Sequence, residues 1–173
     1  KFEVENLNEL VQESIFMQQV AHPEVTYNSR LSETGISLKC DRRQVAQALT
    51  NLLQNAADAL TEAHQPDGEI EVSVLEEDGD AVIEITDNGP GFPEEDQHRL
   101  TEPYVTHRDK GTGLGLAIVK KVMEDHGGQL VLARRTGGGA SARLIFVPGA
   151  SLGDGDPDID VGKEKKEKVA NHG

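Results

Sequence analysis

The feature that most constrains the fold is a long amphipathic pattern between residues 41 and 64. Its apolar residues recur at helical spacing and form one continuous stripe, namely Val45, Leu49, Leu52, Leu53, Ala56, Leu60 and Ala63. Asp41 stands at the expected N-cap, and Pro66-Asp67-Gly68 supplies turn residues after the last apolar position. A long helix with one apolar face has to cover a second apolar surface, so the pattern predicts a layered domain.

Shorter segments supply that second surface. Helical spacing also occurs over residues 7–20 and 112–126, and alternating apolar residues predict a hairpin of strands at 69–75 and 81–87. Four further short strands are predicted, at 24–31, 36–40, 129–134 and 140–147. This order predicts an α/β fold, a two-layer α/β sandwich in which a mixed sheet of about five or more strands carries three helices on one face.

Composition divides the chain into parts. Residues 1–23 predict an N-terminal helix that leads into a compact domain over residues 24–149. Within that domain, residues 88–111 lack periodicity and are rich in Gly, Pro and charge, which is typical of a lid over a functional site. Residues 150–173 offer almost nothing to bury and predict a disordered tail.

The chain is strongly acidic, with 31 Asp and Glu against 17 Lys and Arg and a formal net charge of −14. This balance argues against a nucleic-acid partner. An anionic ligand would have to be held by backbone amides and a few local cations. The single cysteine, Cys40, excludes an internal disulfide and is interpreted as a buried structural thiol.

Polar residues line one face of the long helix, because Asn51, Asn55, Asp58 and Glu62 follow one another at helical spacing. A solvated face is the simpler interpretation, and it suffices for Glu62. Asn is a mediocre helix former, so two of them one turn apart are unusual. Their amide oxygens could serve a hydrated magnesium ion and their nitrogens could contact phosphates.

Two glycine-rich segments complete the set of candidates. Asp87 ends an alternating run and enters a turn with Gly89 and Gly91, where its carboxylate could accept a hydrogen bond from an exocyclic amine. The run Gly111-Thr112-Gly113-Leu114-Gly115-Leu116 opens a helix, whose first amides and dipole favour phosphate. It is neither a Walker A motif nor a dinucleotide-binding fingerprint.

In this order, these segments resemble the N, G1 and G2 boxes of the GHKL superfamily, which comprises gyrase, Hsp90, histidine kinases and MutL. The N box runs from Gln47 to Ala59. Leu100-Thr-Glu-Pro-Tyr104-Val-Thr106 resembles the F box of sensor kinases, and Gly137-Gly138-Gly139 resembles the closing G3 element. The resemblance covers roughly residues 40–148 and implies a Bergerat-type ATP-binding fold.

The resemblance also implies roles for individual residues. Asp87 would bind the adenine amine, in a pocket shaped by Gly89 and Gly91. Asn55 would hold a magnesium ion that bridges the phosphates of ATP, with Asn51 close by. The remaining predicted ATP-binding residues are Asp58 and the lid and helix-start residues Thr106, Arg108, Lys110, Gly111, Thr112, Gly113, Leu114, Gly115 and Leu116. Asn51, Asn55 and Arg108 are the predicted catalytic residues.

Departures from the family pattern narrow the subgroup. Many sensor kinases carry a phosphate-binding Lys where this chain has Asp58, and Asp suits the nitrogen-regulation subgroup. The amino-acid sequences of the lid and of the G2 box resemble those of NtrY-type kinases most. That resemblance implies a cytoplasmic domain of a homodimeric inner-membrane sensor, which works with its own dimerisation and histidine-phosphotransfer domain and with a response regulator of the NtrX type.

Other classes of protein share this kind of pocket. A gyrase-like or Hsp90-like ATPase would carry a water-activating Glu where this chain has Asn51, and without that base phosphoryl transfer to another nucleophile is favoured. An anti-sigma-factor serine kinase and a nucleotide-sensing module without catalysis stay open as alternatives. His22 precedes a proline at a predicted helix end and is interpreted as structural, so the phosphoacceptor histidine is expected upstream of Lys1 and the isolated chain should bind ATP without phosphorylating itself.

Overall fold

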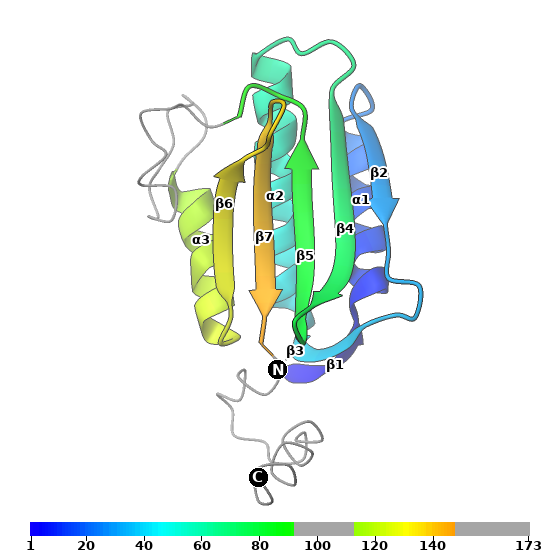
Figure 1. Cartoon of the computed structure of the whole chain (residues 1–173), viewed down its shortest axis with the longest axis vertical. Coiled ribbons are helices and arrows are strands. Elements are labelled where there is room, and N and C mark those ends of the chain that lie inside the picture. Colours follow the sequence, from blue (N-terminus) through cyan, green and yellow to red (C-terminus); the bar gives the residue numbers. More distant parts are fainter. Residues whose placement is uncertain (92–112, 148–173) are drawn as a thin grey trace, which may run out of the picture.

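The computed structural model describes residues 1–91 and 113–147 (Figure 1). Its elements are β1 (Phe2–Asn6), α1 (Leu7–Ala21), β2 (Thr26–Arg30), β3 (Ser37–Asp41), α2 (Arg42–Glu62), β4 (Glu69–Glu77), β5 (Asp80–Asp87), α3 (Gly113–Asp125), β6 (Gln129–Arg134) and β7 (Ala140–Phe146). The three predicted helices and the predicted hairpins are therefore confirmed, with ends that differ by a few residues. Most of the predicted lid and the whole predicted tail lie outside the described residues.

The main sheet has five strands in the order β2-β4-β5-β7-β6. β2 runs parallel to β4, and the other neighbours are antiparallel, so the sheet is mixed as predicted. The strands predicted on either side of residues 32–35 do not share a sheet, because β3 pairs with β1 instead. β1 was not predicted from the sequence, and it forms with β3 a separate two-stranded sheet.

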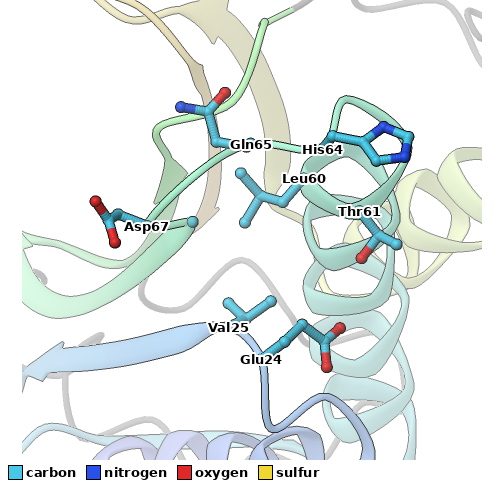
Figure 2. Close-up of a pocket in the computed structure, with 8 residues that line it drawn as sticks. Glu24, Val25, Leu60, Thr61, His64, Gln65 and Asp67 are labelled. Atoms are coloured by element: carbon cyan, nitrogen blue, oxygen red, sulfur yellow. The ribbon is translucent and has the colours of Figure 1, made fainter.

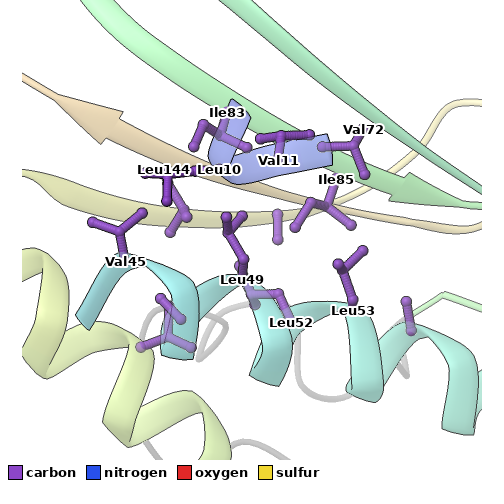
Figure 3. Close-up of a cluster of buried hydrophobic side chains, with 14 of the residues drawn as sticks. Leu10, Val11, Val45, Leu49, Leu52, Leu53, Val72, Ile83, Ile85 and Leu144 are labelled. Atoms are coloured by element: carbon purple, nitrogen blue, oxygen red, sulfur yellow. The ribbon is translucent and has the colours of Figure 1, made fainter. Parts of the chain in front are cut away.

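All three helices cover one face of the main sheet, as Figure 1 shows, and the core lies between the two layers. Leu49 and Leu53 of α2 point toward Val72, Ile83 and Ile85 of the sheet (Figure 3). Burying such side chains supplies most of the driving force for folding, at about 25 cal/mol per Å² of apolar surface. The predicted apolar stripe of α2 is confirmed for all its members except one. Ala63 is exposed and caps the helix after Glu62.

The start of α2 is fixed by the residue expected to cap it. The Asp41 carboxylate accepts hydrogen bonds from the backbone N–H groups of Arg43 (3.0 Å) and Gln44 (3.2 Å). The neighbouring Cys40 is fully buried, which confirms its structural interpretation. Burial raises the pKa of the Cys40 thiol to about 12, and the nearby carboxylates of Glu5 and Asp41 act in the same direction.

A buried histidine, His126, connects the end of α3 to the N-cap of α2 at Asp41. His126 donates from Nδ1 to the carbonyl of Val122 (2.8 Å) and accepts at Nε2 from the backbone N–H of Asp41 (3.0 Å). Its ring lies against the rings of Phe2 and Phe146, with centroids 4.7 Å and 5.9 Å away. Both ring nitrogens are therefore satisfied, and they fix the neutral tautomer with the proton on Nδ1.

Candidate functional site

The two asparagines predicted from the sequence lie on the part of α2 that faces α3. A Cβ built on Gly115, in the first turn of α3, would lie 3.8 Å from both amide atoms of Asn55. One turn earlier, the Asn51 Nδ2 is buried and has no hydrogen-bond partner in the part of the chain that the structure describes. A buried amide without a partner costs stability, which is the pattern expected of a group that awaits a ligand.

Asp58 shares the sequence periodicity of these asparagines but is engaged elsewhere. Its Oδ1 accepts a hydrogen bond from the Gln54 Nε2 at 3.0 Å. The same Gln54 nitrogen lies 3.1 Å from Nε2 of His22, whose other ring nitrogen is 3.5 Å from the Glu24 carboxylate. His22 follows the last residue of α1 as its C-cap, as predicted. The structure thus joins Asp58 to the end of α1, and Glu62 is exposed as expected.

Asp87 is the last residue of β5 and leads into a glycine-rich turn. It is only 6% exposed, and its Oδ1 accepts a hydrogen bond from the Gly89 N–H at 2.8 Å. A Cβ on Gly89 would lie 3.1 Å from the Leu60 side chain. Gly91 has a φ of +79°, and a Cβ there would lie 2.8 Å from the Gly139 carbonyl oxygen. The predicted G1 residues are therefore brought together.

Asn88 fastens this turn to the loop that follows α2, a role that the sequence analysis did not assign. Its Oδ1 accepts from the backbone N–H of Glu69 (2.8 Å), and its Nδ2 donates to the Asp67 carbonyl (3.0 Å). The backbone N–H of Asn88 also donates to the Glu69 carbonyl (3.2 Å). The only sequence signal was the preference of Asn for turns, which does not identify its partners.

The loop between β6 and β7 lies against the opposite side of the Asp87 turn. Gly139 has a φ of +105°, and a Cβ on it would overlap the Asp87 carbonyl oxygen at 1.9 Å. The Arg135 Nη1 donates a hydrogen bond to that same oxygen at 2.9 Å. Gly139, the last glycine of the predicted G3 element, is thus adjacent to the G1 turn. Arg135 was missed, because nothing in its sequence context indicates this contact.

The start of α3 is described only in part. The helix begins at Gly113, and Leu116 is buried in the core. The N-terminal turn of a helix favours anions through its dipole, and here that turn lies beside Asn55. The predicted site residues Thr106, Arg108, Lys110, Gly111 and Thr112 lie outside the described residues.

A separate hollow of about 320 Å³ lies where the end of α2 meets the start of β2. Leu60 and Val25 point toward one another across it, with Glu24 and Thr61 at one side (Figure 2). Neither Asn55 nor Asp87 lines it. Leu60 is nevertheless shared, because the same side chain packs against the position of Gly89.

The arrangement combines two capacities at one end of the sheet. A mostly buried carboxylate in a glycine turn can accept a hydrogen bond from a planar amine. The Asn face of α2 and the first turn of α3 offer amides to anionic oxygens. A ligand with a base at one end and phosphates at the other would satisfy both.

Comparison with known proteins gives a matching family model. Residues 40–150 match the family described as histidine kinase-, DNA gyrase B-, and HSP90-like ATPase. The match contains α2, β5, α3 and the loop with Gly139, so every described part of the candidate site falls within it.

Individual proteins are similar over most of this chain. The nitrogen regulation protein NtrY of Azorhizobium caulinodans is 49% identical over 132 residues, which is 74% of this chain but only 17% of that protein. The structure of the mycobacterial sensor histidine kinase MprB matches with a TM-score of 0.72 and 26% identity, over 86% of this chain and 99% of that one. The histidine kinase ThkA, solved in complex with the response regulator protein TrrA, matches with a TM-score of 0.65 and 27% identity, over 84% of this chain and 41% of that one.

Proposed function

The chain belongs to the histidine kinase-, DNA gyrase B- and HSP90-like ATPase family, and we propose that it is the ATP-binding catalytic domain of an NtrY-like sensor histidine kinase. The observation that carries the proposal is the Asn51 Nδ2, which is buried and has no partner among the described residues, one helical turn from Asn55, which lies beside the first turn of α3. Such a group is costly unless a ligand binds it. An Asn also has no basic nitrogen or carboxylate, so it cannot activate water for hydrolysis.

The nucleotide would lie along the end of α2. Asp87 would accept a hydrogen bond from the adenine amine, while Gly89 and Gly91 keep the base pocket open to it. The phosphates would lie over Asn51, Asn55 and the amides at the start of α3. In this arrangement the described residues bind and position the nucleotide and do not act as a general base. Positioning is the main requirement of phosphoryl transfer.

A magnesium ion suits this donor set. The amide oxygen of Asn55 is a hard ligand of the type that Mg²⁺ accepts, and Mg²⁺ usually keeps water and phosphate oxygens for its other positions. When bound, the ion would neutralise charge on the transferred phosphoryl group. Asp58 is a weaker candidate than the sequence suggested, because its carboxylate is hydrogen-bonded to Gln54.

We further propose the setting of the whole protein. No helix in the described part of the chain is long and apolar enough to cross a membrane. The phosphoacceptor histidine would be on a dimerisation domain outside this chain, in a homodimeric membrane sensor with an NtrX-like response regulator. The similarity to ThkA, which was solved with a response regulator, and to NtrY supports this setting.

The test is Mg²⁺-dependent binding of a non-hydrolysable ATP analogue, measured by calorimetry. Asp87→Ala should weaken binding at least about 100-fold, since it removes a charged acceptor from a buried pocket. Asp80→Ala, at the opposite end of the same strand, is the matched control and should bind normally. Asn55→Ala should bind weakly with or without Mg²⁺. Normal binding by Asp87→Ala would overturn the site assignment, and strong histidine phosphorylation of the isolated chain would overturn the placement of the acceptor.

A further inference from the structure

The backbone at Asp87 lies just past the end of a strand pairing. β5 and β7 are paired from Ala81 with Phe146 to Thr86 with Ser141, and the pairing ends there. The Asp87 carbonyl oxygen, one residue beyond the last of these pairs, accepts the hydrogen bond from the Arg135 guanidinium at 2.9 Å. The Arg135 side chain therefore contacts the backbone of β5 at the point where its pairing with β7 stops.

The position of Arg135 is set by the tight turn between β6 and β7. Its backbone N–H donates to the Gly139 carbonyl (2.9 Å), and its own carbonyl accepts from the Gly138 N–H (3.1 Å). Gly138 and Gly139 have φ values of +115° and +105°, which only glycine adopts without strain. The turn that places the guanidinium is therefore the same turn that packs Gly139 on the Asp87 carbonyl.

On its other side the turn is already anchored by a different residue. The Asn88 side chain holds it to the loop before β4, through hydrogen bonds with Glu69 and Asp67. Asp87 lies between these anchors. Removing the Arg135 contact would loosen the turn on the side of the β6–β7 loop, and the direction of the Asp87 side chain depends on its backbone.

We propose that Arg135 is a positioning residue for adenine selection. It holds the Asp87 carbonyl, and through it the direction of the carboxylate that receives the adenine amine. This inference rests on the proposed function, because it takes Asp87 as the residue that reads the base. Arg135 acts through Asp87 and not as a cation for the phosphates.

A cation that positions Asp87 and a cation that attracts the phosphates would affect ADP and IDP differently. Adenine presents a 6-amino donor to the carboxylate, whereas hypoxanthine presents a 6-oxo acceptor at the same position. A positioning role therefore changes the ratio of affinities for ADP and IDP. Attraction between the guanidinium and the phosphates would change both affinities alike, since the two nucleotides carry the same charge.

The experiment measures the dissociation constants of ADP and IDP with Mg²⁺ for the intact chain and its variants. Arg135→Ala should weaken ADP binding about three- to tenfold, the usual effect of losing one charge-assisted hydrogen bond. IDP binding should change little, so the ADP preference should fall by nearly the same factor. Arg135→Lys keeps a donor and should restore part of the preference. Arg30→Ala, which removes a guanidinium paired with Glu71 on the edge strand, is the matched control and should leave the preference unchanged.

The outcomes separate this inference from the proposed function. If the wild-type chain does not prefer ADP, or if Asp87→Ala keeps the preference, the base-reading role of Asp87 fails. If Asp87→Ala loses the preference but Arg135→Ala keeps it, only the role of Arg135 fails. Arg135→Gln provides a second neutral variant with a longer stem, and thermal unfolding of each variant checks that the measurements are made on folded protein.

Discussion

Two regions along α2 both bury polar side chains, but they differ in how these are satisfied. At the end near Asp41, His126 is 1% exposed, and each of its ring nitrogens has a protein partner. At the middle of the helix, the Nδ2 of Asn51 is buried with no partner among the described residues. We call the region around Asp41 the base end, and the region from Asn51 through Asn55 to the Asp87 turn the site end. At the base end the buried polar groups are satisfied within the chain, whereas at the site end we propose that a bound ligand satisfies them.

The same contrast extends to the turns. At the base end, Gly128 lets the chain pass the Ile145 carbonyl, where a Cβ would lie 2.2 Å away. At the site end, Gly139 makes a similar approach to the Asp87 carbonyl. Both contacts are tight, but only the second shapes a residue proposed to meet a ligand. Substitutions at the two ends should therefore separate stability from binding.

The largest loss of stability should come from His126→Ala. The change removes a ring packed between two aromatic rings and leaves the Asp41 N–H and the Val122 carbonyl without partners. The free energy of unfolding should fall by about 3 kcal/mol or more, measured by urea denaturation. Nucleotide affinity should persist at temperatures where the variant is folded. His64→Asn, at an exposed position, is the control and should change stability little. If the folded His126→Ala variant lost nucleotide affinity, stability and binding would not be separated between the base end and the site end.

Gly139→Ala should combine both effects. The new Cβ would overlap the Asp87 carbonyl at a φ that Ala disfavours, so we expect a loss of about 2–3 kcal/mol in unfolding free energy together with loss of nucleotide binding. Gly137→Ala tests strain alone, because its φ is also positive but no atom lies within 4 Å of its Cβ position. It should cost about 1 kcal/mol and leave binding intact. Equal behaviour of the two variants would show that the contact with Asp87 is unimportant.

Alkaline pH should weaken the fold through two buried protons. Burial raises the pKa of Cys40 from 9.0 to about 12, and burial, assisted by the Glu24 carboxylate, raises the pKa of Tyr27 from 10.0 to about 12. Both groups ionise first in the unfolded chain, so the stability they contribute is complete below pH 9 and is lost as the pH rises toward 12. Unfolding free energy should fall by about 1.4 kcal/mol per pH unit for each such group.

The control for this pH dependence is Cys40→Ala. In this variant the unfolding free energy should fall less steeply between pH 9 and 12, because one of the two ionising groups is gone. The neighbouring variant Lys39→Ala should leave the slope unchanged. Urea titrations at several pH values measure both. A slope that Cys40→Ala does not alter would mean that this thiol is not a buried, protonated group of the base end.

The smallest change in stability should come from Asn51→Ala, at the site end. The change removes an amide nitrogen that is buried without a partner among the described residues and replaces Asn by a better helix former, so the unfolding free energy should rise by about 0.5–1 kcal/mol. Affinity for the Mg²⁺–nucleotide complex should nevertheless fall at least about tenfold. Thermal unfolding and calorimetry on the same samples measure the two effects. Destabilisation by Asn51→Ala would show that this side chain has a structural role like that of His126.

Local sequence patterns predicted most of the fold. The stripe of α2 and the hairpin of β4 and β5 could be read because their periodicity is long and their partners are near in sequence. β1 was missed, because a short strand beginning the chain pairs with a segment far along it, Phe2 with Asp41. The capping role of Asp41 was predicted, but its second contact, with His126, depends on the tertiary fold.

The candidate site was predictable where glycine or asparagine is required by local geometry. Gly91 and Gly139 have positive φ and approach backbone atoms too closely for other residues, and Gly89 lies in tight contact with the Leu60 side chain. Arg135 could not be found this way, since it lies 48 residues from Asp87 and its contact is to a backbone atom that any residue would provide. The role of Asp58 stays a prediction: helical spacing placed it with Asn55, and the structure adds a hydrogen bond from Gln54 that the sequence did not indicate.

The length of α2 has a mechanical consequence. The helix has 21 residues, is about 30 Å long, and contains no proline at which it could bend. We therefore expect α2 to move as a rigid body, so that a displacement applied near Arg42 would also displace Asn55. A larger protein that pulls on the base of this domain would in this way change the geometry around the nucleotide without unfolding any element.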